Sequence, residues 1–345
     1  MRKVIIIILG EILYFCLILG AWATEPLVQP KQQPKEIQIY GGPLGQSAYL
    51  MPFALSDLIN KNSTWLRATA IQTKGTMENV RILQKYPERR ANAVIWASPM
   101  ASFGAANGLP PFTERFIGIK FLSLGALNGS WFVSINPQIR TAEDLVGKRI
   151  GYGPKAGGPD IPIEFTLRHG YGILDKVKVT YLGGDAVKDA LLDGMIDAGV
   201  AAVVITDEKM DWVPTPAFNE LFNTKSCYLI SLDAEVQTKT RNATGIPMGH
   251  EVLKPKEWGK TKAQPWTVQG HYNSFGVHES MNDDIVLEIL RDIYENTERF
   301  ADYNIAGKGL KKETMTKIGC KRTDFHPAAV KFFQEKGVRK IGLLD

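Results

Sequence analysis

The sequence lacks the features that mark several common classes of protein. Its 345 residues carry a net charge of +5, and the lysines and arginines are spread along the chain without forming a block. This pattern argues against nucleic-acid binding and against a polybasic membrane patch. The five histidines show neither an HExxH motif nor a paired spacing, and there are three cysteines. We therefore expect no metal site and no cofactor.

A long apolar run occurs only at the N-terminus. Arg2 and Lys3 precede an apolar stretch from Val4 to Gly20, and "AWA" follows at 21–23. This order is typical of a secretory signal, which predicts a signal peptide over residues 1–23. Because Glu11 interrupts the apolar run, an uncleaved membrane anchor remains the alternative. Residues 24–35 ("TEPLVQPKQQPK") show no periodicity and are interpreted as a linker.

Export would leave two cysteines in the mature chain, Cys227 and Cys320. An oxidising compartment permits a disulfide between them. Two separate buried thiols are the interpretation that we favour, although the sequence leaves both states open.

From residue 36 onward, strands and helices alternate. The strands "IQIY", "WLRATAIQT" and "NAVIWA" enclose a helix at 48–60 and another that ends near Gln84. A second set contains "KRIGYG", "VKVTYL" and "IDAGVAAVV", with a helix expected to stop at Gly170 and another at 184–194. This order predicts largely parallel sheets with right-handed crossovers. The Gly/Pro-rich stretch 244–265 is expected to be a loop.

Extended segments near 119–133 and 266–277 join the two sets of elements. They predict an α/β protein with two lobes around a cleft, in which the chain leaves the first lobe, builds the second and returns. The expected boundaries are 36–125 for the first part of lobe 1, 126–265 for lobe 2, and 266–345 for the return to lobe 1.

Three glycine-containing turns, at 41–47, 73–76 and 153–160, each lead from a strand into a helix. Exposed N–H groups and the helix dipole favour an anion at such a position. Ligands of open parallel sheets bind beyond the carboxyl ends of the strands, where these turns would lie. The three turns together favour a binding cleft.

Enzymatic interpretations of the same turns are weaker. "GQSAY" resembles a nucleophile elbow around Ser47, but Tyr49 replaces the second glycine and no His and acid follow in a supporting context. "GYGPKA" at 151–156 fits a loose dinucleotide pattern, yet Pro154 and Pro159 delay the helix that this pattern requires. Neither turn contains the G-K-[ST] of a phosphate-binding loop.

Several segments together resemble one family, the TAXI group of solute receptors of TRAP transporters. The matching segments are "GPLGQSAYL", "TKGTMENVRILQ", "AVIWASPMA", "RTAEDLVGKRIGYGPKAGG", "ALLDGMIDAGVAAVV", "VPTPAFNEL" and "HPAAVKFFQEKG", in the family's order. The resemblance implies a type II periplasmic-binding-protein fold, in which each lobe is a mainly parallel sheet flanked by helices. It also implies a protein without catalytic activity that captures a small carboxylate, an amino acid or an oxo acid in the periplasm, and we expect this protein to be a monomer. The implied partner is a TRAP-type membrane permease.

The sequence departs from the family at Gln46, Ala48, Leu50 and Pro99, which lie close to the implied pocket. The ligand-binding residues carried over to this chain come from both lobes. They are Gly42, Gly45, Ser47, Tyr49, Thr73, Lys74, Gly75, Thr76 and Ser98 from lobe 1, and Lys155, Gly157 and Gly158 from lobe 2. Lys74 and Lys155 are the cations of these turns and are expected to meet a carboxylate.

Two other functions remain open. An enzyme on the same two-lobed fold, such as a lyase or deaminase, would need acid and base residues in the cleft, whereas the turns supply mainly Gly, Ser, Thr and Lys. A ligand-binding sensor subunit without a permease would have the same sequence features as a receptor.

Overall fold

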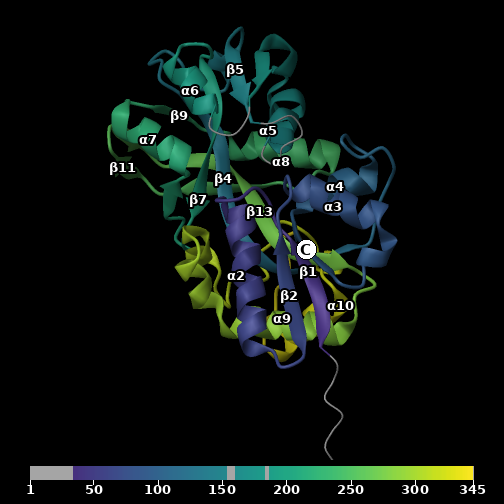
Figure 1. Cartoon of the computed structure of the whole chain (residues 1–345). Coiled ribbons are helices and arrows are strands. Elements are labelled where there is room, and N and C mark those ends of the chain that lie inside the picture. Colours follow the sequence, from purple (N-terminus) through teal and green to yellow (C-terminus); the bar gives the residue numbers. More distant parts are fainter. Residues whose placement is uncertain (1–33, 154–159, 183–185, 345) are drawn as a thin grey trace, which may run out of the picture. The chain divides into compact units, whose positions relative to one another are not determined.

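A computed structural model describes residues 34–153, 160–182 and 186–344 (Figure 1). The expected signal peptide, most of the expected linker, and Lys155, Gly157 and Gly158 lie outside these residues. Within the described part of the chain, no helix combines the length and the apolar character needed to cross a membrane.

The first elements alternate strand and helix, as the sequence predicts. They are β1 (Lys35–Tyr40), α2 (Ser47–Asn62), β2 (Leu66–Ile71), α3 (Thr76–Lys85), β3 (Ala93–Ala97) and α4 (Pro99–Asn107). All five residues of β3 are buried. In α3 the buried residues Met77, Val80 and Leu83 recur at helical spacing and form the face that packs on the sheet.

Two long strands, β4 (Ile119–Ser134) and β13 (Trp266–His278), run through the middle of the molecule (Figure 1). They pair antiparallel from Gln269 opposite Ser130 to His278 opposite Ile119, with register shifts after Asn273 and after Phe275. The two extended segments expected from the sequence are thereby confirmed, and they lie side by side.

The second set of elements follows β4. It comprises β5 (Arg149–Tyr152), α5 (Asp160–Phe165), β6 (Lys178–Tyr181), α6 (Ala186–Leu192), β7 (Ala198–Ile205), β8 (Trp212–Pro214), α7 (Pro216–Thr224), β9 (Tyr228–Ile230) and α8 (Ala234–Thr244). Strands β5, β6 and β7 pair in parallel, as expected from alternating strands and helices.

One sheet joins both sets, in the order β2-β1-β3-β13-β4-β7-β5-β6. The pairs β1–β3 and β5–β6 are parallel, whereas β13–β3, β13–β4 and β4–β7 are antiparallel. The sheet is thus parallel toward each end and antiparallel in the middle. The change of direction arises because β4 and β13 carry the chain out of the first set and back into it.

Two expectations need correction. The helix predicted to stop at Gly170 continues as a π-helix over Thr166–Tyr171, and the left-handed residue that ends it is Gly172. Gly170 instead allows close packing on α8, since a Cβ there would lie 2.5 Å from Cγ1 of Val236.

The stretch 244–265, predicted to be a loop, contains three short strands. They are β10 (Gly249–Leu253), which pairs with β13, and β11 (Lys256–Trp258) with β12 (Thr261–Ala263), which pair with each other. The local sequence does not favour strands here, and pairing with a distant strand decides the conformation of β10.

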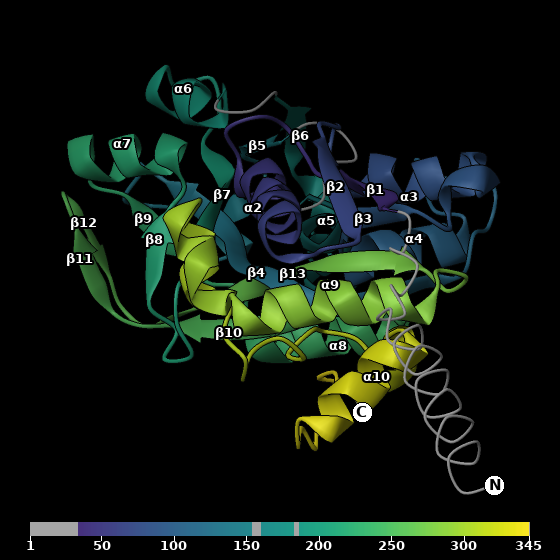
Figure 2. The same cartoon turned by 60° about the horizontal axis from the view of Figure 1, so that its bottom comes forward.

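The C-terminal elements return to the first set. Helix α9 (Asp283–Glu295) begins after Asn282, whose side chain caps it, and α10 (Pro327–Glu335) begins after His326. Helix α9 packs against α2 and α10 (Figure 2). Its buried face, with Ile285, Ile289 and Ile293, completes the core of the first set.

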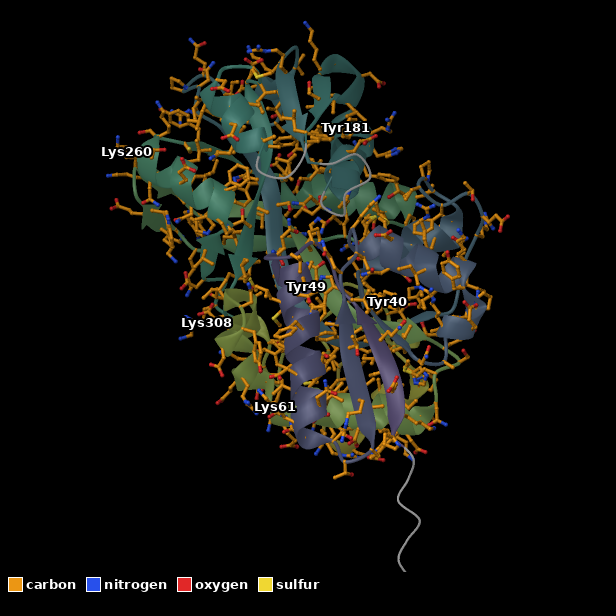
Figure 3. The ribbon with its side chains drawn as sticks, viewed as in Figure 1. Tyr40, Tyr49, Lys61, Tyr181, Lys260 and Lys308 are labelled. Atoms are coloured by element: carbon orange, nitrogen blue, oxygen red, sulfur yellow. The ribbon has the colours of Figure 1, made fainter. Side chains whose placement is uncertain are left out.

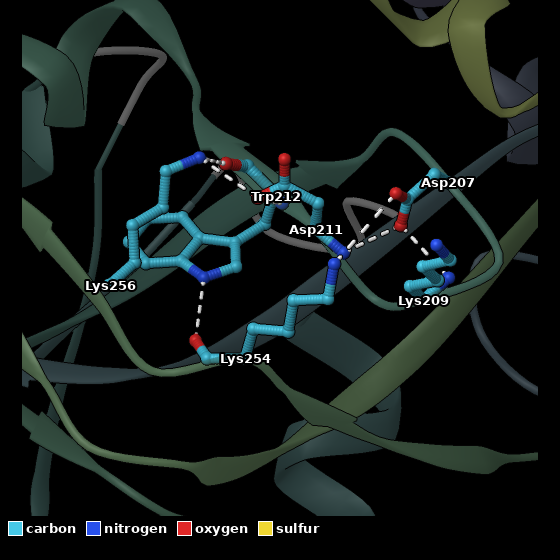
Figure 4. A network of polar contacts seen from close by, with 6 residues as sticks. All are labelled: Asp207, Lys209, Asp211, Trp212, Lys254 and Lys256. Atoms are coloured by element: carbon cyan, nitrogen blue, oxygen red, sulfur yellow. Dashed lines mark hydrogen bonds and ion pairs between the residues drawn. The ribbon is translucent and has the colours of Figure 1, made fainter.

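A polar and aromatic network holds the outer strands of the second set (Figure 4). The Lys256 ammonium donates to Oδ1 of Asp211 at 2.9 Å and to the carbonyl of Trp212 at 2.7 Å, and it lies over the rings of Trp212 and Trp258. The Trp212 indole N–H donates to the carbonyl of Lys254 at 3.0 Å. These contacts join β8 to β11, so we assign the network a structural role.

Candidate functional site

The topology places the ends of β1 and β3 at a switch point. In the order β2-β1-β3, the connections leave β1 and β3 toward opposite sides, and a crevice forms beyond the strand ends at such a point. The turn that follows β1 contains residues 41–46, and β3 is followed directly by Ser98. Two of the predicted ligand-binding segments therefore lie where this fold places a ligand.

The strand ends are held together by a residue that the sequence analysis did not select. Asn79 is fully buried, and its amide donates to the carbonyls of Tyr40 at 3.1 Å, Gly41 at 2.7 Å and Trp96 at 2.8 Å. Since Tyr40 ends β1 and Trp96 lies in β3, one side chain fixes both strand ends. Asn79 belongs to the segment "TKGTMENVRILQ", so the signal was present in the sequence.

The turn after β1 has the close packing expected of its glycines. A Cβ at Gly42 would lie 2.5 Å from Cβ of Ala48, and Gly45 has a φ of 78°. Helix α2 then begins at Ser47, and its first turn has neither a side-chain cap nor an acidic residue. No acidic side chain among the described residues of this first turn offsets the positive end of the helix dipole, so the start of α2 favours an anion.

Tyr49 is the third residue of α2, and it is half-buried. Its ring stacks on Phe53 with the centroids 6.2 Å apart, and Phe53 in turn contacts Tyr303. Figure 3 shows Tyr49 near the middle of the molecule, at the opposite end of α2 from Lys61.

The turn after β2 supports the first turn. The Thr73 hydroxyl lies 2.8 Å from the carbonyl of Gly41 and accepts from the N–H of Gly75 at 3.0 Å. The Glu78 carboxylate accepts from the N–H of Lys74 at 2.5 Å and so supplies the negative charge at the start of α3. The Thr73 N–H also donates to the carbonyl of Gly42 at 3.4 Å, so Thr73 lies beside Gly42. Gly75 and Thr76 follow in the same turn, and the Lys74 side chain is exposed. A role of these residues in ligand binding stays a prediction.

Ser98 caps α4 and also lines a small pocket. Its side chain accepts from the N–H of Ala101 at 3.2 Å, and it is buried. The pocket, called here the central pocket, is lined by Ser98, Pro99, Met100, Pro162, Pro247, Gln269, Gly270, His271 and Tyr272. The space open to the centre of a water molecule is about 10 Å³, enough for about one water.

The floor of the central pocket belongs to β13, and polar side chains follow one face of β13 and β4. Gln269 lies opposite Ser130 and His271 lies opposite Asn128, while Nδ2 of Asn273 donates to Oδ1 of Asn128 at 3.2 Å. Side chains at alternate positions of a strand share a face. These five residues form what we call the central ladder.

Burial makes the central ladder unusual. Gln269 and Ser130 are each 1% exposed, and among the described residues neither the amide of Gln269 nor the hydroxyl of Ser130 has a hydrogen-bond partner. A buried polar group without a partner is destabilising, typically by about 1–3 kcal/mol. Gln269 lines the central pocket and Ser130 lies opposite it, so these two unpaired groups mark a candidate site.

The sequence analysis missed the central ladder. The signal was the alternation of Gln269, His271 and Asn273 in the segment "WTVQGHYNSFGV", which was predicted only to be extended. The pairing of this segment with Asn128 and Ser130 spans more than a hundred residues, which the sequence pattern does not show.

A carboxyl–phenol pair lies next to the pocket. The Tyr272 hydroxyl donates to Oε1 of Glu251 at 2.6 Å. Burial raises the pKa of Glu251, and the bond from Tyr272 lowers it in part. A Cβ at Gly270 would lie 3.3 Å from Oε1 of Glu251, so the pair reaches the wall of the pocket.

A second concavity, called here the basic groove, lies in the second set of elements. Its volume is about 500 Å³, and its lining includes Arg140, Tyr228, Lys260 and Lys262. The Arg140 guanidinium stacks 3.5 Å above the Tyr228 ring, and Lys260 lies at the margin of the molecule (Figure 3). These cations are exposed, which makes the groove a weaker anion site per charge than a buried pocket.

The remaining candidate chemistry finds no support in the described residues. No three His, Cys, Asp or Glu side chains in this part of the chain lie close enough to hold a metal ion. Cys227 and Cys320 are buried in different hydrophobic clusters and are not joined in a disulfide, which confirms the favoured interpretation of two separate thiols.

Similarity to solved structures concerns the fold. MatC from Rhodopseudomonas palustris with bound malate has a TM-score of 0.50 and 10% identity, over 88% of this chain and 97% of that chain. A TctC solute binding protein from Polaromonas has a TM-score of 0.46 and 12% identity, over 82% and 87% of the two chains. The periplasmic aliphatic sulphonate binding protein SsuA from Escherichia coli has a TM-score of 0.46 and 12% identity, over 88% and 84%. The predicted two-lobed α/β fold of the type II periplasmic binding proteins is confirmed.

Sequence comparison gives the family. No curated protein matches the chain, whereas the model of the NMT1-like family matches residues 39–337. Because this match covers most of the sequence, the chain belongs to the NMT1-like family.

Proposed function

We propose that the chain is a solute-binding receptor that captures a small organic anion in the central pocket. The observation that carries this proposal is the central ladder, a set of buried and partly buried polar side chains beside a pocket that Ser98, at the end of β3, also lines. Pockets of this kind, mostly apolar with a few convergent polar groups, are typical of small-molecule sites.

The anion is proposed to be a carboxylate. The start of α2 at Ser47 offers uncapped N–H groups, and the turn that contains Gly42 and Gly45 leads into it. Lys155, with Gly157 and Gly158, is proposed to approach from lobe 2, although it lies outside the described residues. A lysine and a helix start that face one pocket would together favour a negatively charged ligand.

The receptor is proposed to work by hinge motion. The central pocket has room for about one water, so a solute can enter only if the two lobes separate. Strands β4 and β13 connect the lobes, and their register shifts lie beside the ladder at Asn273 and Phe275. Contacts from both lobes to a bound ligand would then favour the closed state.

The cellular role follows from the resemblance to TAXI receptors. We propose that residues 1–23 direct the chain to the periplasm and that the mature monomer delivers its ligand to a TRAP-type permease. MatC, a structure of similar fold, contains malate, which makes dicarboxylic acids a reasonable part of any ligand screen.

A thermal-shift screen of the mature chain against carboxylic and amino acids tests the proposal. A ligand present at about 100 times its Kd should stabilise the fold by about 2.7 kcal/mol. Lys155→Ala should lower the affinity at least about tenfold, as expected when one member of a buried charge pair is removed. Lys260→Ala, in the basic groove, is the matched control and should bind like the wild type. A loss of affinity in the control alone would place the ligand in the basic groove and contradict the proposal.

A further inference from the structure

We infer that Gln269 and Ser130 select solutes that carry a hydroxyl group beside a carboxylate. This inference rests on the proposed function, since it concerns the ligand of the same pocket. It names the chemical class of that ligand and two residues that determine specificity.

The two side chains form one polar surface. Gln269 and Ser130 face each other across β13 and β4, and directly opposed side chains in antiparallel strands have Cβ atoms about 5 Å apart. Gln269 lines the central pocket. Among the described residues, both the Nε2 and Oε1 atoms of Gln269 and the Oγ of Ser130 are buried without a hydrogen-bond partner.

The hydrogen-bonding capacity of these atoms restricts the ligand. The amide of Gln269 offers two donors at Nε2 and an acceptor at Oε1, and a hydroxyl such as that of Ser130 both donates and accepts. A carboxylate or oxo group only accepts, so it would leave Oε1 of Gln269 unpaired. A ligand that satisfies this surface must present a donor and an acceptor side by side.

A hydroxy acid meets this requirement better than an amino acid. The ligand hydroxyl would donate to Oε1 of Gln269 while a carboxylate oxygen accepts from Nε2. An ammonium group would also donate, but a buried charge needs a charged partner. None of the described residues that line the pocket carries a carboxylate, and the Glu251 carboxyl at its wall already accepts from the Tyr272 hydroxyl. A neutral hydroxyl is therefore the favoured donor.

Calorimetric titration with matched pairs of acids tests the inference. The pairs are lactate and propionate, glycolate and acetate, and malate and succinate, each of which differs by one hydroxyl group, with alanine as the amino-acid comparison for lactate. The wild type should bind the hydroxylated member of at least one pair about tenfold tighter or more, because the other member leaves buried groups unpaired. Alanine should bind more weakly than lactate.

Variants of the two residues should remove this preference. Gln269→Met keeps the length of the side chain without its polar atoms, and Ser130→Ala removes the hydroxyl. Each should reduce the preference within a pair to about threefold or less. Ser274→Ala is the matched control, since Ser274 is also a buried hydroxyl without a partner among the described residues but lies opposite Leu124 and not opposite Gln269.

The alternative is that Gln269 and Ser130 serve only the fold. In that case both variants would change the free energy of unfolding and leave the ratio of affinities unchanged, which would overturn the inference. A wild type with no preference for the hydroxylated acids would overturn it as well, while the proposed function would stand. If the wild type binds none of these acids and no acid in the wider screen, the proposed function itself fails. Should Gln269→Met not fold, Ser130→Ala alone decides between these outcomes.

Discussion

The side-chain amide of Asn79 donates hydrogen bonds to the carbonyl of Trp96 at 2.8 Å and to the carbonyl of Gly41 at 2.7 Å. Asn79 belongs to helix α3, and its side chain joins the end of β1 to the end of β3. The two strand ends are therefore held at a fixed separation, and Gly42 and Ser98 lie just beyond them.

Asn79→Ala should destabilise the fold. The substitution leaves three buried carbonyls without this donor and creates a small cavity, so we expect a loss of about 2–4 kcal/mol in the free energy of unfolding. Urea denaturation of the mature chain measures it. Asn107→Ala is the matched control, because the Asn107 amide bonds to a carbonyl at an exposed site, and its effect should stay within about 0.5 kcal/mol. Equal effects of the two substitutions would show that Asn79 does not hold the strand ends.

Asp292 should make stability depend on pH. Burial raises the pKa of this α9 carboxyl from 3.8 to about 6, and the bond from the Asn62 amide offsets part of this shift. Since the pKa in the folded state is the higher one, the contribution to stability is complete below about pH 4 and is lost as the pH rises through about 6. Asp292→Asn should remove this dependence and stabilise the fold at pH 8 by on the order of 2 kcal/mol.

Asp57→Asn provides a comparison of opposite sign. Hydrogen bonds from Lys61 and Tyr303 lower the pKa of Asp57, so its contribution is present at neutral pH and is lost on acidification. Thermal unfolding of both variants between pH 4 and 8 measures the two trends. A destabilised Asp292→Asn protein at pH 8 would contradict the assignment of a strained buried carboxylate.

Ser47 should contribute to binding without acting as a nucleophile. Ser47→Ala is expected to weaken ligand binding by about 1–3 kcal/mol if the hydroxyl pairs with a buried ligand group. The wild type should show neither turnover of its ligand nor covalent labelling by a serine-directed probe, which intact-mass spectrometry detects. Stoichiometric labelling of Ser47 would instead support an enzyme on this fold.

Cys227 should resist modification in the folded chain. Burial raises the pKa of its thiol to about 11, so little thiolate is present at neutral pH, and the thiolate is the reactive form. We expect alkylation of Cys227 at pH 7.5 to be slow in buffer without denaturant and to become fast only when denaturant unfolds the chain. Fast labelling of Cys227 in the native protein would show that its part of the second set opens readily.

The local sequence predicts most of the fold because strands and helices alternate with clear apolar periods. The buried run "AVIWA" and the spacing of Met77, Val80 and Leu83 are examples, and the structure places β3 and α3 accordingly. Prediction from the local sequence failed where contacts with distant residues decide the conformation. Strand β10 forms because it pairs with β13, and Gly170 lies inside a helix because α8 packs closely against it.

The positions of some candidate site residues were predictable for the same reason. Turns such as 41–47 have a local signature, and the structure places Gly42, Thr73 and Ser98 around neighbouring strand ends. The pair of Gln269 and Ser130 has none, since each is an ordinary polar residue in its own segment. Their significance arises from burial and from the antiparallel register of β4 and β13.

A crystal structure of the mature chain with the tightest acid from the screen tests the central claim most directly. The proposal predicts that the acid lies in the central pocket, with its carboxylate near the start of α2 and a polar group within hydrogen-bond distance of Gln269. Density for the acid in the basic groove, beside Arg140 and Lys260, with the central pocket unchanged, would contradict it.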